Sequence, residues 1–196
     1  MSLPDPALVV LVGASGSGKS SWAAQRYRSE EVVSSDTLRG VVGSGPHDLD
    51  ASADAFAILE SIVAARLGRR LTTVVDTLGY DTARRRGWLA RAREAGLPAV
   101  LVVLETSDDE CRRRNARRDR PLPARALAAQ LRRRRDVVTE AADEGWDLVL
   151  PVAAELPPPA ASPAASPMAD DRTASTGVEV VLQVSRFPWG EDPMAW

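Results

Sequence analysis

Short apolar runs and polar stretches alternate along most of this 196-residue chain. Runs rich in apolar residues and bounded by turn signals predict five strands, over 8–12, 31–35, 71–75, 99–104 and 146–150. The segments between them carry apolar residues at helical spacing, as Phe56, Leu59 and Val63 do. They predict helices over 20–28, from a cap at Asp50 or Ser52 to Gly68, from Asp81 or Thr82 to Gly96, over 106–115 and over 124–143.

Glycine and proline mark the breaks between these elements. They predict a loop over 40–46, and Pro151 is expected to end the fifth strand. In the last helix, the residues expected to be buried are Leu127, Leu131 and Val138.

Strict alternation of strands and helices predicts an α/β fold with an open, parallel, five-stranded sheet and helices on both faces. Ligands of such sheets bind at the carboxyl ends of the strands. Asp36 and Asp76 both lie at predicted carboxyl ends, as does a glycine-rich segment after the first strand. We therefore expect one site formed by these three features.

The composition changes after Pro151. Residues 152–177 are dominated by Ala, Pro and Ser, which predicts a semi-extended linker. Residues 178–184 read as a new strand, which suggests that 178–196 begin a second, truncated domain. The expected organisation is a domain over 1–151, a linker over 152–177 and the start of another domain over 178–196.

The glycine-rich segment matches G-x-x-x-x-G-K-[ST], the phosphate-binding P-loop of nucleotide-binding proteins. It consists of Gly13, Ala14, Ser15, Gly16, Ser17, Gly18, Lys19 and Ser20. Its glycines let backbone N–H groups approach phosphate oxygens, and the following helix directs its positive end at the same anion. Lys19 is expected to reach the β- and γ-phosphates of ATP, and the Ser20 hydroxyl to bind Mg²⁺.

Charge and composition narrow the class of protein. Lys19 is the only lysine among 25 basic residues, and the net charge is −2. Residues 84–135 hold 16 of the 24 arginines, so a local basic surface is compatible with the balanced total.

One cysteine and one histidine exclude an intramolecular disulfide and a multi-His or Cys/His metal site. Because the N-terminal apolar run is short, we expect neither a signal peptide nor a membrane span, and a cytoplasmic protein.

Two aspartates are candidates for the chemistry. Asp36, just past the second strand, is a candidate base for an acceptor hydroxyl; it can equally be a turn or N-cap residue. Asp76 ends the third strand, where a carboxylate can hold Mg²⁺ through water or accept a hydrogen bond from Ser20. The alternative for Asp76 is a cap of the next loop.

Arginines near residues 117–123 can close over phosphates as a lid, since a guanidinium neutralises developing charge. Most of the run from 112 to 120, and the four arginines over 132–135, are expected to be solvated surface. His47 is expected to face solvent, Cys111 to be a small core residue, and the tryptophans to pack in the interior.

These segments together resemble the P-loop kinase module of the polynucleotide 5′-kinase family, most closely that of bacterial end-healing enzymes. The resemblance covers about residues 7–151. It is carried by the P-loop, by Ser34-Ser35-Asp36-Thr37-Leu38-Arg39, by Val74-Val75-Asp76-Thr77 and by Arg114-Asn115-Ala116-Arg117-Arg118-Asp119-Arg120-Pro121.

The resemblance implies a role for each matching position. Lys19 and Ser20 would hold ATP and Mg²⁺, and Asp36 would be the base that activates a 5′-hydroxyl. Arg39 would contact a phosphate of the acceptor, and Arg117 and Arg120 would be lid arginines on the ATP phosphates. The lid segment is one residue shorter than the usual pattern, so Arg117 and Arg118 can exchange roles.

Two further features of the sequence bear on the substrate. Many relatives carry an Asn soon after the aspartate at Asp76, whereas this chain has Thr77-Leu78-Gly79. The segment 180–187 weakly resembles the first barrel strand of luciferase-like flavin-dependent oxidoreductases, which would make nucleic acid a less obvious substrate.

The expected function is an ATP-dependent kinase whose first candidate acceptor is a polynucleotide 5′-hydroxyl. A small-molecule kinase on the same scaffold is the alternative within enzymes. A nucleotide-sensing module that binds ATP and regulates a fused C-terminal enzyme is the alternative from another class.

Overall fold

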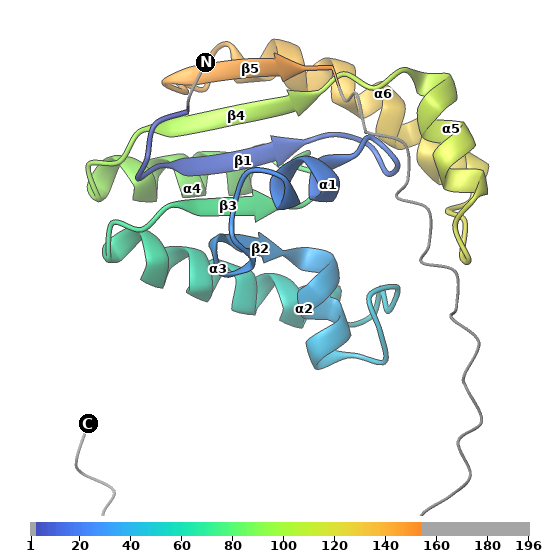
Figure 1. Cartoon of the computed structure of the whole chain (residues 1–196), viewed down its shortest axis with the longest axis horizontal. Helices are drawn as coiled ribbons and strands as arrows, with labels where there is room; N and C mark the ends of the chain where they lie inside the picture. Colours follow the sequence, from blue (N-terminus) through green and yellow to red (C-terminus); the bar gives the residue numbers. More distant parts are fainter. Residues whose placement is uncertain (1–2, 154–196) are drawn as a thin grey trace, which may run out of the picture. The chain divides into compact units, whose positions relative to one another are not determined.

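The computed structural model describes residues 3–153, so the linker and second-domain predictions from residue 154 onward lie outside the described residues. Its centre is a five-stranded sheet (Figure 1). The strands are β1 (Leu8–Val12), β2 (Val32–Ser34), β3 (Thr73–Asp76), β4 (Ala99–Leu104) and β5 (Leu148–Val152). They lie in the order β2-β3-β1-β4-β5, and every neighbouring pair is parallel. The predicted fold class is confirmed.

Helices connect successive strands, as a parallel sheet requires. They are α1 (Lys19–Ala24), α2 (Ser35–Val42), α3 (Ser52–Gly68), α4 (Thr82–Glu94), α5 (Asp108–Ala116) and α6 (Ala124–Ala141), with a 3-10 turn over Ser29–Glu31. Short polar side chains begin three of them, since their oxygens accept from backbone N–H groups left free at a helix start. These caps are Ser34 for α2, Asp81 for α4 and Ser107 for α5.

The sheet is buried on both faces. On one face, α3, α4 and α6 pack through Leu59, Val63, Trp88, Leu89 and Val137 against alternate residues of the strands. On the other, Trp22 and Ala23 of α1 cover the remaining strand residues. Trp22, Trp88 and Trp146 are all buried, and so is Cys111, as the sequence predicted.

Several details differ from the sequence prediction, besides shifts of one or two residues at strand ends. The loop predicted over 40–46 begins later, because α2 continues to Val42 before Gly43 ends it. The first helix ends at Ala24 and not near residue 28. On α6, Val137 is fully buried while Val138 is 42% exposed, so the predicted inward residue is wrong by one position. Pro151 lies inside β5, which tolerates a proline because this strand is at the edge of the sheet.

Within residues 3–153, no helix has both the length and the apolar content needed to cross a membrane.

Candidate active site

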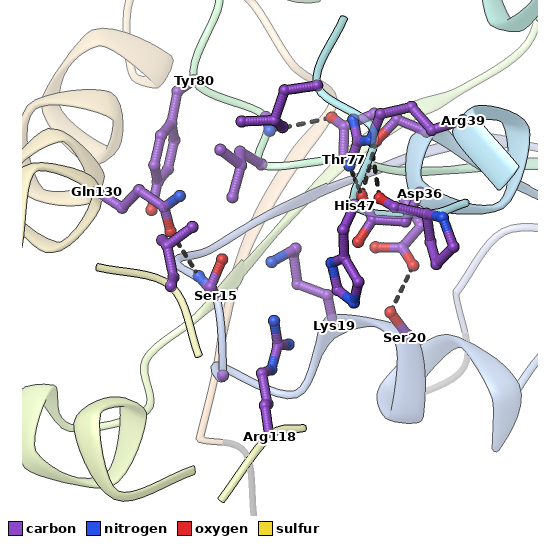
Figure 2. A pocket seen from close by; sticks show the side chains of 18 of the residues that line it. Ser15, Lys19, Ser20, Asp36, Arg39, His47, Thr77, Tyr80, Arg118 and Gln130 are labelled. Carbon is purple, nitrogen blue, oxygen red and sulfur yellow. Dashed lines mark hydrogen bonds and ion pairs between the residues drawn. The ribbon is translucent and has the colours of Figure 1, made fainter. Parts of the chain in front are cut away.

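A cavity of about 820 Å³ opens at the carboxyl ends of the strands. Its walls come from the P-loop, the start of α2, the loop after β3 and the segment between α5 and α6, which we call the lid (residues 117–123). Figure 2 shows Lys19, Asp36 and Arg118 converging on this space. Since ligand cavities commonly measure about 300–1,000 Å³, the space suits a nucleotide together with a small group.

The P-loop has the backbone that its glycines were expected to allow. Gly16 and Gly18 have φ values of +82° and +92°, in the left-handed region that side chains disfavour. A Cβ on Gly16 would also lie 2.8 Å from the carbonyl oxygen of Cys111. The loop is therefore closed against α5, and α1 begins directly after Gly18 with its free N–H groups at the cavity.

Lys19 lies within the curl of the loop. Its Nζ donates to the carbonyl oxygens of Gly13 at 2.8 Å and of Ala14 at 3.1 Å. Burial lowers the pKa of Lys19, and the negative charges of Asp76 and Asp36 oppose that shift. The ammonium group is thus poorly solvated, although two carboxylates are near it. A phosphate that enters the cavity would stabilise its charge in place of the missing water.

Ser20 and Asp76 form the contact between the P-loop and β3. The Ser20 hydroxyl donates to Oδ2 of Asp76 at 2.7 Å. Burial raises the pKa of Asp76, while this hydrogen bond and the charge of Lys19 lower it. Of the two roles that the sequence left open for Asp76, the contact with Ser20 is present.

These two oxygens fit a magnesium ion. Mg²⁺ prefers oxygen ligands and commonly uses one or two protein groups together with water and substrate phosphates. Among residues 3–153, no group of three or more His, Cys, Asp or Glu side chains is arranged to hold a metal. A site that relied on Ser20, Asp76 and a bound triphosphate would not require such a group.

Asp36 occupies the first turn of α2 and lines the cavity. The helix cap is Ser34, whose Oγ accepts from the Thr37 N–H at 3.4 Å, so Asp36 is not needed as a cap. The Asp36 side chain is 68% exposed and forms an ion pair with Arg39. The carboxylate is therefore accessible to a second ligand.

Arg39 lies beside Asp36 and connects it to the following loop. Its side chain is only 13% exposed, and its Nε donates to the Pro46 carbonyl oxygen at 3.0 Å. This bond holds the 43–49 loop against α2, and His47 lines the same cavity while remaining exposed. His47 is exposed, as the sequence predicted, but nothing in the sequence indicated that it lines the cavity.

Only some of the lid arginines line the cavity. Arg118 and Arg120 line the cavity, as does Arg114 at the end of α5, whereas Arg117 does not. The positive charge of Arg118 contributes to the lowered pKa of Lys19, which indicates that the two cations are near each other. Of the two residues that the short lid left interchangeable, Arg118 is the one at the cavity.

Asn115 holds the two ends of the lid together. Its Nδ2 donates to the Leu122 carbonyl oxygen at 2.9 Å, and its Oδ1 accepts from the Leu122 N–H at 3.0 Å. Asn115 is buried, and both bonds are at least partly shielded from water. The lid is thereby a closed loop whose arginines project from a fixed base.

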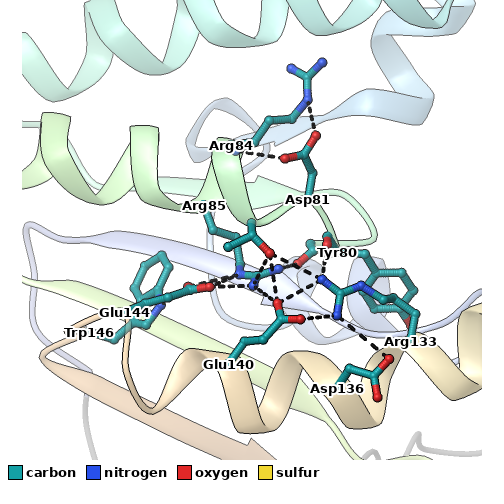
Figure 3. Close-up of polar contacts among 11 residues, drawn as sticks. Tyr80, Asp81, Arg84, Arg85, Arg133, Asp136, Glu140, Glu144 and Trp146 are labelled. Carbon is teal, nitrogen blue, oxygen red and sulfur yellow. Dashed lines mark hydrogen bonds and ion pairs between the residues drawn. The ribbon is translucent and has the colours of Figure 1, made fainter.

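A buried ion network supports the loop after β3 (Figure 3). Arg85 is fully buried and pairs with Glu144 at 2.5 Å and with Glu140 at 3.0 Å. It also donates to the Gly79 carbonyl oxygen at 2.7 Å, and Arg133 donates to that of Tyr80 at 3.1 Å. The hydrogen bond from Arg133 helps to lower the pKa of Glu140 to about 2. The network thus fixes the backbone of the loop that forms one wall of the cavity.

The arginines over 132–135 were expected to be surface charge, which is wrong for two of them. Arg133 belongs to the buried network, and Arg134 donates to the Thr106 carbonyl oxygen at 2.6 Å and pairs with Asp108 at 3.0 Å. Both are partly buried, and their contacts hold α6 against neighbouring segments.

Sequence reasoning missed several residues of the cavity wall. Gln130 of α6 accepts from the Ser15 N–H at 2.9 Å. Arg84 lies over the ring of Phe56, with its Cζ 4.1 Å from the ring centroid, and Tyr80 also lines the cavity. None of these belongs to a sequence motif, and only their positions just after β3 or on the helix after the lid could have suggested them.

One comparison with known proteins identifies a family for most of the described chain. A family model described as an AAA domain matches residues 8–140. A search of curated protein sequences gives no significant match.

Solved structures share the fold at low sequence identity. A structure of the Pnkp1/Rnl/Hen1 RNA repair complex matches with a TM-score of 0.59 and 20% identity, over 71% of this chain and 47% of that one. Kti12 from Chaetomium thermophilum, in complex with ADP-AlF3, matches with a TM-score of 0.52 and 20% identity, over 76% and 89%. The PezAT toxin–antitoxin system of Streptococcus pneumoniae matches with a TM-score of 0.55 and 13% identity, over 78% and 69%.

At these identities the neighbours establish the fold, and the chain spans about half of the RNA repair protein. The family model, in contrast, covers more than half of the chain, from β1 into α6. With its P-loop and its parallel sheet of order β2-β3-β1-β4-β5, the chain belongs to the AAA domain family and has a P-loop kinase-like fold.

Proposed function

We propose that this protein is an ATP-dependent kinase that transfers the γ-phosphate to a hydroxyl group. The observation that carries the proposal is the shared cavity of Lys19 and Asp36, which come from separate motifs. A nucleotide site alone would account for Lys19. An accessible carboxylate at the same cavity supplies the group that a hydroxyl acceptor needs.

ATP would lie along the P-loop, with its phosphates on the N–H groups at the start of α1. Lys19 would leave the carbonyl oxygens of Gly13 and Ala14 and bind the β- and γ-phosphates. Ser20 and Asp76 would hold Mg²⁺, which neutralises phosphate charge when bound. Arg118 and Arg120 of the lid would bind the same phosphates from the opposite side.

Asp36 would take the proton of the acceptor hydroxyl. The acceptor oxygen then forms a bond to the γ-phosphorus, and the bond from that phosphorus to the β,γ-bridging oxygen breaks, leaving ADP. The Arg39 guanidinium, paired with Asp36, would hold this carboxylate in its orientation. Lid arginines would stabilise the charge on the transferring group.

The acceptor can be of two kinds. The Ser34–Arg39 segment and the lid resemble those of polynucleotide 5′-kinases, which makes a 5′-hydroxyl end the first candidate. A small molecule is the second candidate, because two arginines of the cavity wall outside the lid are already paired. Arg39 binds Asp36, and Arg84 lies near Glu60 at 3.3 Å and Asp81 at 3.4 Å.

A transfer assay tests the proposal and separates these acceptors. The protein is incubated with Mg²⁺ and γ-labelled ATP, either with a 5′-hydroxyl oligonucleotide or with a panel of small hydroxyl compounds, and Lys19→Ala serves as the control. Label on an acceptor, absent with the control, is the expected result. If the oligonucleotide is the acceptor, its binding should weaken with rising salt, whereas the binding of a small acceptor should change little.

Two outcomes would count against the proposal. Failure to bind Mg·ATP would remove its foundation. ATP binding without label on any hydroxyl would favour a nucleotide-sensing module that acts on a fused partner.

A further inference from the structure

Gln130 contributes to the cavity wall from a helix outside both the P-loop and the lid. Gln130 lies on α6, about two turns beyond its start, and lines the cavity (Figure 2). It is 115 residues from Ser15, whose backbone N–H it accepts at 2.9 Å. This bond connects α6 to the P-loop, so Gln130 does more than pack the helix against its neighbours.

The Ser15 bond fixes the orientation of the Gln130 amide. Because the Ser15 group is a donor, the Gln130 atom that faces it must be the oxygen Oε1. The amide nitrogen Nε2 is therefore the free end, and Figure 2 shows it turned toward the interior of the cavity. Within residues 3–153 this nitrogen has no hydrogen-bond acceptor. Its N–H donors thus face the space in which a nucleotide would lie.

The same peptide group connects Gln130 to Lys19. The Ala14–Ser15 peptide accepts from Lys19 Nζ through its carbonyl at 3.1 Å and donates to Gln130 through its N–H at 2.9 Å. A P-loop lysine reaches the β- and γ-phosphates. Gln130 therefore lies at the end of the loop where the terminal phosphates would be bound.

We propose that Gln130 is a γ-phosphate contact, whose Nε2 donates to the terminal phosphate of ATP while its Oε1 holds the Ala14–Ser15 peptide. The site would thereby prefer a nucleoside triphosphate to a diphosphate. This inference rests on the proposed nucleotide site but not on transfer to any acceptor, because it concerns binding alone.

The substitution Gln130→Glu separates this role from a purely structural one. A glutamate keeps an oxygen that can accept from the Ser15 N–H, but it replaces the free donor by a negative oxygen. If Gln130 only orients the peptide, Gln130→Glu should bind nucleotides as the wild type does. If Gln130 contacts the γ-phosphate, the new charge should repel ATP much more than ADP.

The experiment measures the Kd of Mg·ATP and Mg·ADP by calorimetry for the wild type, Gln130→Glu and Gln130→Ala. Loss of a charge-assisted hydrogen bond is expected to raise the Kd for ATP about tenfold or more. The Kd for ADP should change by less than about threefold. Gln25→Glu adds the same charge at an exposed position outside the cavity and should leave both constants unchanged.

Equal ratios of the ATP and ADP constants in the wild type and Gln130→Glu would overturn the inference. Gln130→Ala provides a second reading, since it removes the donor without adding a charge and should also lose ATP affinity selectively. A wild type that binds neither nucleotide would overturn the proposed function as well. Nucleotide discrimination that persists without any phosphoryl transfer would support this inference and count only against the kinase.

Discussion

The Ser20 hydroxyl donates a 2.7 Å hydrogen bond to Oδ2 of Asp76, which lies 56 residues further along the chain. The parallel order of β3 beside β1 makes this contact possible, because both strands end at the same edge of the sheet. The contact joins the P-loop to the wall of the cavity that faces it. It also gathers the two oxygens that fit Mg²⁺.

Replacing Asp76 by asparagine should therefore weaken Mg²⁺ binding while the fold persists. The amide keeps the shape of the side chain and an oxygen that accepts from Ser20, but it loses the charge that attracts the ion. We expect the Mg²⁺ concentration at half-maximal ATP binding to rise about 10- to 100-fold. A titration of Mg²⁺ at fixed ATP measures this, and an unchanged midpoint would exclude Asp76 from the magnesium site.

The two adjacent lid arginines should differ in their effects. Arg118 lines the cavity and Arg117 does not. Arg118→Ala is expected to reduce phosphoryl transfer about 100-fold or more, as the loss of a cation at the transferring group does. Arg117→Ala removes the same charge one residue away and should change the rate by less than about threefold. If Arg117→Ala reduces the transfer rate more than Arg118→Ala does, Arg117 is the lid arginine that contacts the phosphates.

The buried network predicts a large stability effect at a position remote from any motif. Arg85→Leu leaves the carboxylate of Glu144, also fully buried, without its cation. An unpaired buried charge of this kind costs about 3–5 kcal/mol in the free energy of unfolding. Urea denaturation measures it, with Arg86→Ala on the exposed side of α4 as the control. If the two variants are equally stable, the ion pair is not important for the fold.

Two glycines give opposite predictions for the same change. Gly79 has a φ of +70°, and a Cβ there would lie 2.5 Å from the Leu11 carbonyl oxygen, so Gly79→Ala should destabilise the protein by more than about 1 kcal/mol. Gly87 lies on α4, where a Cβ would have no neighbouring atom within 4 Å. Gly87→Ala should stabilise the protein by about 0.5–1 kcal/mol. Thermal unfolding of both variants checks the pair, and equal shifts would contradict this explanation.

The sequence predicted the sheet and the P-loop well because both depend on local patterns. Fully apolar runs such as 99–104 have few alternatives to a buried parallel strand. The glycines of the P-loop are needed for its backbone, so their spacing is legible in the sequence.

Other features depend on contacts between distant residues and could not be read locally. Arg85 looks like a surface residue among three arginines, and only the folded chain brings Glu140 and Glu144 to it. Val137 and Val138 are chemically alike, so the choice between them depends on how α6 is rotated. Gln130 reaches the P-loop because the lid turns the chain back, which no spacing rule indicates.

The replacement of Asp36 by asparagine tests the central claim most directly. Asparagine keeps the size of the side chain but is a far weaker base. If Asp36 is the base of a kinase, this variant should still bind ATP but should lose turnover. Calorimetry should give a Kd for Mg·ATP within about threefold of the wild type. Transfer of labelled phosphate to the acceptor found in the transfer assay should fall about 10²- to 10⁴-fold. Transfer at the wild-type rate in Asp36→Asn would contradict the assignment of Asp36 as the base and, with it, the proposed arrangement of donor and acceptor in this cavity.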